Sequence, residues 1–170
     1  MPHLPLTIRR ALIAILFLVP ATPASAQVLT ILHNFGGGAS DGAHSDGSLV
    51  QSGSTLFGMT YYGGSASGNG NGTIFEIGAN GTSFGLLRSF SGGPGDGAIP
   101  FGSLTISGTT LYGMTQFGGN TGTGSNGLGA VVKVAMDGTG AALVHSFTGA
   151  PGDGSSPNGS LVESGGSLYG

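Results

Sequence analysis

The nine residues LFGMTYYGG at positions 56–64 decide the fold, because they return as LYGMTQFGG at positions 111–119. The chain ends at residue 170 on SLYG, which opens the same phrase a third time. Glycine accounts for 37 of the 170 residues. A phrase that returns at a fixed spacing in such a chain predicts folded repeats whose short strands are joined by tight turns.

Other residues follow the same spacing. Phe35, Phe90 and Phe147 lie 55 and 57 residues apart. The two extra residues of the second interval fall in one polar loop, which has nine residues at 120–128 where the first copy has seven at 65–71. A flexible glycine-rich linker has no reason to confine an insertion in this way, so the sequence favours repeats over a linker.

Each repeat contains four short segments whose apolar residues predict β-strands. In the first copy these are residues 48–51, 55–60, 72–77 and 83–90, and the last two recur at 129–134 and 141–147. Asn80-Gly81 and Asp137-Gly138 lie between the last two strands, where both residues of a tight hairpin would take positive φ. Helix is not expected, because every long stretch contains glycine.

The predicted fold is all-β, with antiparallel four-stranded units arranged like the blades of a propeller and incomplete at about two and a half repeats. The expected boundaries are 1–26 for a signal peptide, 27–87 for repeat 1, 88–144 for repeat 2 and 145–170 for a partial repeat 3. Because each unit depends on its neighbours, the chain is expected to be a fragment of a longer protein with further repeats. A ring closed by several copies and an open β-solenoid are the alternatives.

The glycine of the repeated phrase has an expected role. Gly58 and Gly113 are predicted to let a neighbouring backbone approach closely. Leu56, Leu111 and Leu168 supply one apolar anchor per repeat.

The first 26 residues differ from the rest. Arg9 and Arg10 precede an apolar run at 11–19, and Ala24-Ser25-Ala26 places small residues where a signal peptidase reads. This pattern predicts a secretory signal peptide cleaved before Gln27. The apolar run is too short to span a bilayer, and the residues around the arginine pair favour general secretion over the twin-arginine route.

After residue 26 the chain carries two strong cations, Arg88 and Lys133, against seven acids, for a net charge of −5. This balance argues against nucleic acid and anionic membranes as partners. The sequence has no cysteine, so neither disulfides nor thiolate metal sites can stabilise the fold.

The two copies, LHNFGGGASDG…NGTIFEIGANGT and LRSFSGGPGDG…LGAVVKVAMDGT, together with the partial third, resemble the GloVer-type (Gloeo/Verruco) tandem repeat of bacterial extracellular choice-of-anchor proteins. The resemblance covers residues 32–170 and departs from the family at four positions, Ser45, Phe57, Met59 and Met114. It implies surface display, with repeat arrays followed by a sorting or anchoring signal, and carries over no catalytic residue.

Asp41, Asp96 and Asp153 recur at one repeat position, each followed by glycine. A calcium site in each repeat is one interpretation, but Ca²⁺ takes six to eight oxygen ligands and each loop supplies one or two carboxylates. The alternative, an Asx-type turn, is favoured. No other cofactor is expected.

His33 and His145 share one repeat position with Arg88, which predicts a polar site on the strand surface rather than a ligand pair or a general base. The acids are dispersed and no nucleophile elbow is present, so catalysis is not expected.

Four aromatic residues are candidates for a carbohydrate-binding face: Tyr61, Tyr62, Tyr112 and Phe117. Packing between repeats explains their spacing equally well. The sequence therefore predicts a secreted protein with a structural or binding role, attached to the cell surface. The alternatives are a polysaccharide hydrolase or lyase whose catalytic acids lie in further blades, and a β-solenoid adhesin.

Overall fold

The computed structural model describes residues 29–65, 70–120 and 127–170. All the described strands lie in one compact unit, Ile31–Gly170. The predicted signal peptide lies outside the described residues. Within those ranges the regular elements are strands in antiparallel sheets, which confirms the all-β prediction. No helix long and apolar enough to cross a membrane is found in the described residues.

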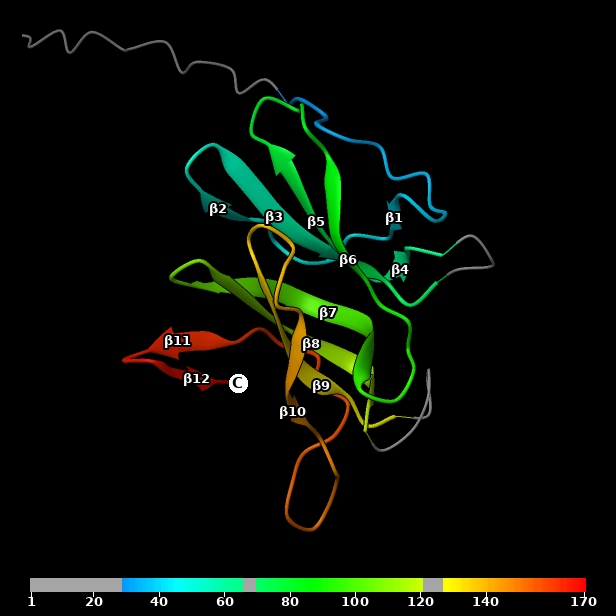
Figure 1. The fold of residues 1–170 in the computed structure, drawn as a ribbon, viewed down its shortest axis with the longest axis vertical. Helices are drawn as coiled ribbons and strands as arrows, with labels where there is room; N and C mark the ends of the chain where they lie inside the picture. Colours follow the sequence, from blue (N-terminus) through cyan, green and yellow to red (C-terminus); the bar gives the residue numbers. More distant parts are fainter. Residues whose placement is uncertain (1–28, 66–69, 121–126) are drawn as a thin grey trace, which may run out of the picture. The chain divides into compact units, whose positions relative to one another are not determined.

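Repeat 1 forms a four-stranded sheet in the order β2-β3-β5-β6 (Figure 1). Its strands are β2 (Val50–Ser52), β3 (Thr55–Thr60), β5 (Thr73–Gly78) and β6 (Gly85–Ser89). All four predicted strands are therefore present, with boundaries that differ by one or two residues. A short ribbon of β1 (Gly42–Ala43) and β4 (Tyr62–Gly63), which the sequence did not predict, extends this repeat.

Repeat 2 forms the same sheet, and its first two strands are longer than those of repeat 1. β7 (Asp96–Ser107), β8 (Thr110–Gly119), β9 (Ala130–Ala135) and β10 (Ala142–Ser146) are ordered β10-β9-β8-β7. In repeat 2 the strands of the ribbon continue into those of the first hairpin, so that β7 and β8 span both. Their pairing has a register shift between Phe101 and Thr105. Repeat 3 supplies one hairpin, β11 (Val162–Ser164) and β12 (Ser167–Tyr169).

The turns at Asn80-Gly81 and Asp137-Gly138 differ from the prediction. Only the glycines take positive φ, 82° at Gly81 and 81° at Gly138. The Asn80 side chain instead accepts hydrogen bonds from the amide and the hydroxyl of Thr82, at 3.1 and 2.8 Å. These connections contain six residues, so a two-residue hairpin turn is not needed to bring the strands together.

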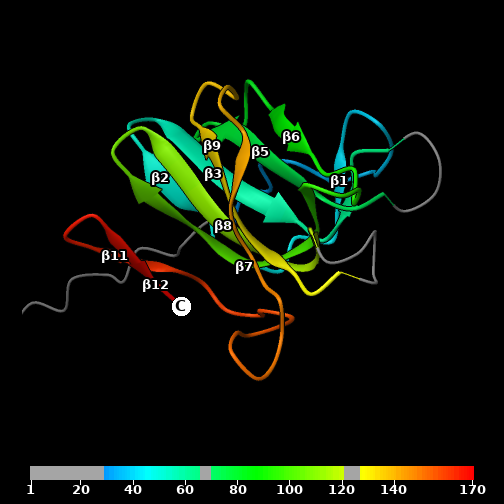
Figure 2. The ribbon, with the colours of Figure 1, turned by 60° about the horizontal axis from the view of Figure 1, so that its bottom comes forward.

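The main hydrophobic core lies between the sheets of repeats 1 and 2, which are stacked face to face (Figures 1 and 2). Phe57, Met59 and Ile74 of the first sheet, together with Phe90 directly after its last strand, pack against five side chains of the second sheet and its connections: Leu104, Leu111, Ala130, Val132 and Val134. A smaller cluster of Met114, Val131 and Leu161 lies between repeats 2 and 3. Neither core belongs to a single repeat.

The glycine of the repeated phrase makes room for side chains, which corrects the prediction of a close backbone. A Cβ at Gly113 would lie 2.9 Å from Met59 Sδ and 3.2 Å from Leu104 Cδ2. At Gly58 the obstructing atoms belong to Phe75 and Leu49. The methionine of one repeat therefore packs over the glycine of the next.

Close backbone approach occurs at another glycine of the repeat. A Cβ at Gly47 would collide with the carbonyl oxygen of Gly102, and one at Gly102 with that of Gly159. The neighbouring residues form matching hydrogen bonds, because the amide of Ser48 donates to Ser103 Oγ at 2.9 Å and the amide of Ser103 donates to Ser160 Oγ at 2.8 Å.

A residue with left-handed backbone recurs in the same region. His44, Ile99 and Ser156 hold φ at 57°, 57° and 50°. For a β-branched residue such as Ile99 this conformation is strained. The amide of Ile99 donates to Asn71 O and that of Ser156 to Leu128 O, both at 2.8 Å, so contacts from the preceding repeat hold this conformation.

We predict that Gly102→Ala lowers the free energy of unfolding by about 1–2 kcal/mol for the left-handed backbone, plus a further ~1–3 kcal/mol for the collision with Gly159. Gly108→Ala is the matched control, because Gly108 has φ +59° and nothing within 4 Å of an added Cβ. Urea denaturation of the two variants measures the difference, and equal losses would show that the close approach contributes nothing.

Candidate functional site: the aspartate loops

The three recurring aspartates close one loop in each repeat, which we call the aspartate loop. It comprises residues 36–41, 91–96 and 148–153. In each, the carboxylate accepts a hydrogen bond from the first amide of the loop: Gly36 to Asp41 at 2.7 Å, Ser91 to Asp96 at 2.8 Å and Thr148 to Asp153 at 2.9 Å. It also accepts one from the amide of the following glycine, at 2.7 to 2.8 Å.

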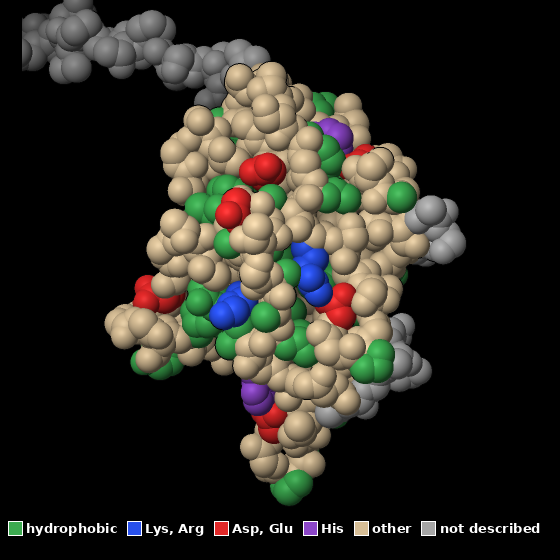
Figure 3. All heavy atoms as spheres, viewed as in Figure 1, with side chains coloured by type: hydrophobic (Ala, Val, Ile, Leu, Met, Phe, Trp, Pro, Cys, Tyr) green, Lys and Arg blue, Asp and Glu red, His purple; other side chains and the backbone are tan. Residues whose placement is uncertain are grey.

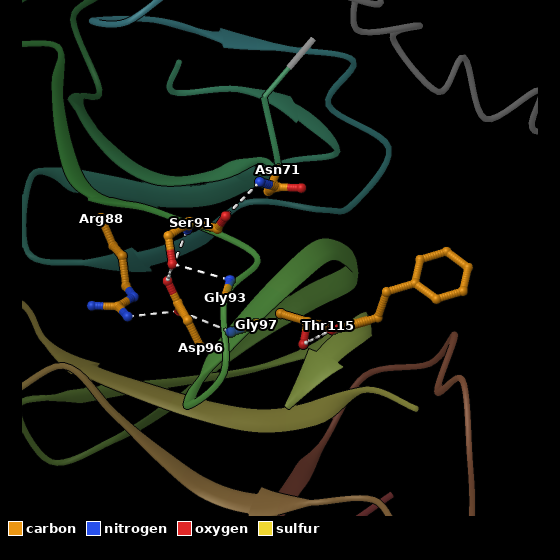
Figure 4. A network of polar contacts seen from close by, with 8 residues as sticks. Asn71, Arg88, Ser91, Gly93, Asp96, Gly97 and Thr115 are labelled. Carbon is orange, nitrogen blue, oxygen red and sulfur yellow. Dashed lines mark hydrogen bonds and ion pairs between the residues drawn. The ribbon is translucent and has the colours of Figure 1, made fainter. Parts of the chain in front are cut away.

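A basic side chain eight residues before the aspartate completes each aspartate loop. His33 Nε2 lies 2.9 Å from Asp41, Arg88 Nη2 lies 2.7 Å from Asp96 and His145 Nε2 lies 3.0 Å from Asp153. The carboxylate thus connects the segment before the loop, the first residue of the loop and the residue after it; at Asp96 these segments are the strands β6 and β7. Figure 4 shows Arg88, Ser91 and Gly97 converging on Asp96.

The Asp96 loop is the most enclosed of the three. The Asp96 side chain is 11% exposed, against 19% for Asp41 and 23% for Asp153. The hydroxyl of Ser91 adds a bond of 2.7 Å to Asp96. The side-chain amide of Asn71 donates to Ser91 O at 2.8 Å, which attaches this loop to the connection between β4 and β5.

The hydrogen bonds also determine the electrostatics of the aspartates. Burial acts to raise the pKa of Asp96, but the amide of Ser91, the guanidinium of Arg88 and the hydroxyl of Ser91 outweigh it and lower the pKa. The pKa of Asp153 is likewise lowered, mainly by the amide of Thr148. The aspartates are therefore held as carboxylates that accept several hydrogen bonds within the loop, and at Asp96 the guanidinium of Arg88 also balances the charge.

This geometry bears on the calcium interpretation. The oxygens of Asp41, Asp96 and Asp153 already accept bonds from amide, hydroxyl, imidazole or guanidinium donors. No group of three or more histidines or acids that could hold a metal ion occurs among the described residues. The contacts favour the structural alternative, although the carboxylates accept from the amides five residues before and one residue after them, and not from the amide two residues after as in an Asx turn.

The pairing of cation and aspartate was missed in the sequence, where His33, Arg88 and His145 are interpreted as strand-surface residues. The signal was present: in every repeat the cation precedes the aspartate by eight residues. Asx-type bonding does occur, but at Asn80 and Asp137, whose side chains accept from the amides of Thr82 and Thr139.

The aromatic candidates occupy two kinds of position. Tyr61 and Tyr112 lie at contacts between repeats, because Tyr61 meets Phe101 at 6.1 Å between ring centroids and Tyr112 packs on the cluster around Met114. Tyr62 and Phe117 share one repeat position and are half-buried. Tyr62 lines a hollow of about 280 Å³ beside His44 and the aspartate loop of repeat 1.

The fold and the loops define a tandem-repeat all-β protein in which each unit is completed by the next. The chain belongs to the Gloeobacter/Verrucomicrobia repeat family, whose profile matches residues 17–170. This bears out the resemblance carried by the repeated phrases. Searches of curated proteins and of solved structures found no match.

We predict that Asp96→Asn lowers the free energy of unfolding by about 2–3 kcal/mol, because it removes the charge that Arg88 and three further donors require. Asp153→Asn should cost less, since the same loop is more exposed in repeat 3. Arg88→His, which installs the residue found at positions 33 and 145, should cost less than about 1 kcal/mol. Equal losses for all three variants would contradict this ranking.

The lowered pKa also predicts a pH dependence for Asp96. Its contribution to stability is complete above the unfolded pKa of about 3.9 and is lost as the pH falls through the lower folded value. The difference in stability between the wild type and Asp96→Asn should therefore be constant from pH 7 to 5 and shrink below about pH 4. Denaturation at a series of pH values tests this, and a constant difference down to pH 2 would contradict it.

Proposed function

We propose that this protein is a secreted, non-catalytic repeat protein with a structural or binding role at the bacterial cell surface. The observation that carries the proposal is the recurrence of one junction between repeats. The contacts of Gly47 with Gly102 are repeated between Gly102 and Gly159, and those of Ser48 with Ser103 between Ser103 and Ser160. A chain that repeats its own interface builds an extended surface, the usual basis of binding in repeat proteins.

In this proposal the sheets follow one another as blades of a propeller. Supporting it, the glycine contacts lie at the first-strand edge of each sheet, with Gly102 in β7 and with Gly47 and Gly159 three residues before β2 and β11. The fourth strands β6 and β10 lie at the opposite edge of each sheet. An open β-solenoid uses the same junctions without closure and remains the alternative.

The aspartate loops support a role without catalysis. Their carboxylates hold the chain where one repeat passes into the next, and a general acid or base would need a free proton site facing a substrate. Figure 3 shows the charged side chains of one face dispersed among uncharged ones. A hydrolase would instead be expected to bring two carboxylates together across a cleft.

Carbohydrate is the ligand class we propose for the binding role. Tyr62 and Phe117 recur at one position, so successive repeats would present successive rings. Flat apolar rings beside polar loops are suited to the apolar faces of sugars.

Expression of the whole chain with its own leader in a Gram-negative host tests the proposal. We expect the protein outside the cytoplasm with Gln27 at its N-terminus, and Ala26→Arg should prevent the cleavage. The purified protein should be retarded in gels that contain soluble polysaccharide, less so after Tyr62→Ala, without releasing reducing ends. An uncleaved cytoplasmic protein would contradict secretion, and release of reducing ends would favour the hydrolase alternative.

A further inference from the structure

The exposed edge of β12 differs from the same edge in the other repeats. In repeat 1 the second strand β3 pairs on one side with β2 and on the other with β5, and in repeat 2 β8 pairs with β7 and β9. In the described part of repeat 3, β12 pairs with β11 alone. The backbone groups of its other edge are therefore available to an added strand.

An apolar hollow lies next to this edge. It has a volume of about 260 Å³ and is lined mainly by Met114, Val131, Phe147, Leu161 and Leu168. Met114, Val131 and Leu161 are 5 to 9% exposed, whereas Phe147 and Leu168 are only partly buried, so the hollow is open on their side. The equivalent surface of repeat 1, which includes Met59, Ile74 and Phe90, is 0 to 4% exposed. The hollow is thus the repeat 2 counterpart of a surface that is covered in the core between repeats 1 and 2.

The covered surface identifies what fits the hollow. At the junction of repeats 1 and 2, Ala130, Val132 and Val134 of β9 pack against Met59, Ile74 and Phe90. β5 has the same alternation, with Phe75 and Ile77 at the positions of Val132 and Val134. The partner at the hollow would place two large apolar side chains, two residues apart, on one face of an extended strand.

We propose that the free edge of β12 and the apolar hollow beside it form a docking site for one extended strand of the β5 and β9 type, supplied by a further repeat of this kind. The strand would pair antiparallel with β12 in the register that joins Leu111 to Val134 and Gly113 to Val132, with Leu168 and Gly170 taking the places of Leu111 and Gly113. This inference rests on the proposed repeat array, and it identifies the kind of strand that would cover the edge of β12 and the apolar hollow.

Residues 31–34, near the start of the described residues, also have no paired strand beside them. Residues 31–34 stand at the repeat position of the outer strands β6 and β10, and Ile31 is 70% exposed. Among the described residues they form no strand, whereas β6 pairs with β5 and β10 with β9. A strand of the β5 and β9 type would therefore fit beside residues 31–34 as it would fit beside β12.

A synthetic peptide with the sequence of residues 128–136, LGAVVKVAM, tests the docking site. Hydrogen exchange of the chain 27–170 should slow at least about tenfold at the amides of Leu168 and Gly170 when the peptide is in excess, because these amides face the added strand in the proposed register. The amides of Ser167 and Tyr169 face β11 and should change less. Exchange at Val50–Ser52, the free edge of the first sheet, is the internal reference and should not change.

Two altered peptides test whether binding of the strand depends on apolar side chains that enter the hollow. Lys133→Glu should protect β12 as well as the original, because Glu76 holds this position in β5. Val132→Asp with Val134→Asp should abolish the protection, since both side chains would enter the apolar hollow. Absence of protection by the original peptide, or equal protection by the double aspartate peptide, would overturn the proposal. Neither result would bear on secretion or carbohydrate binding, which are measured separately.

Discussion

The structure depends on one constraint: one apolar face of each sheet is buried only by the sheet of the next repeat. In β5, Phe75 packs on Phe35 and Phe84 of its own repeat, whereas Ile74 on the opposite face belongs to the core shared with repeat 2. A single sheet would leave one of these faces in water, which costs about 25 cal/mol for each Å² of apolar surface. The hydrophobic core therefore forms between repeats, where Met59 of one packs over Gly113 of the next.

The aspartate loops solve a second problem, that of orienting successive sheets without disulfides and with few charges. Each loop lies where the outer strand of one sheet leads to the first strand of the next. A carboxylate such as Asp96 connects three points of the chain there, because it bonds to Arg88, Ser91 and Gly97. Hydrogen bonds to an ionised carboxylate are stronger than neutral ones, so a small number of contacts holds the boundary.

Much of the fold could be predicted from the sequence, because periodic patterns report local structure. The alternation in TIFEI and AVVKV predicted β5 and β9 almost to the residue. The ribbon of β1 and β4 could not be predicted in the same way, since its residues, such as Gly42 and Gly63, have no apolar alternation and pair because the flanking strands bring them together.

The candidate site was predicted less well than the fold, for a related reason. Asp41, Asp96 and Asp153 were found as a recurring set, yet their partners were assigned to a solvent-facing surface. A position that holds His33, Arg88 and His145 has no single residue identity, so identity alone hides what these side chains share. Only their basic character and their constant spacing of eight residues before the aspartate reveal the pairing.

The junction at Gly47, Gly102 and Gly159 has a consequence for how such genes change over generations. Because each repeat meets its neighbours through the same residues, a duplicated repeat arrives with both of its faces already suited to the copies beside it. Recombination within the coding region can then lengthen or shorten the protein by whole units without a compensating mutation. Changes of one or two residues are tolerated elsewhere, in the loops at 65–71 and 120–128, where the copies already differ in length.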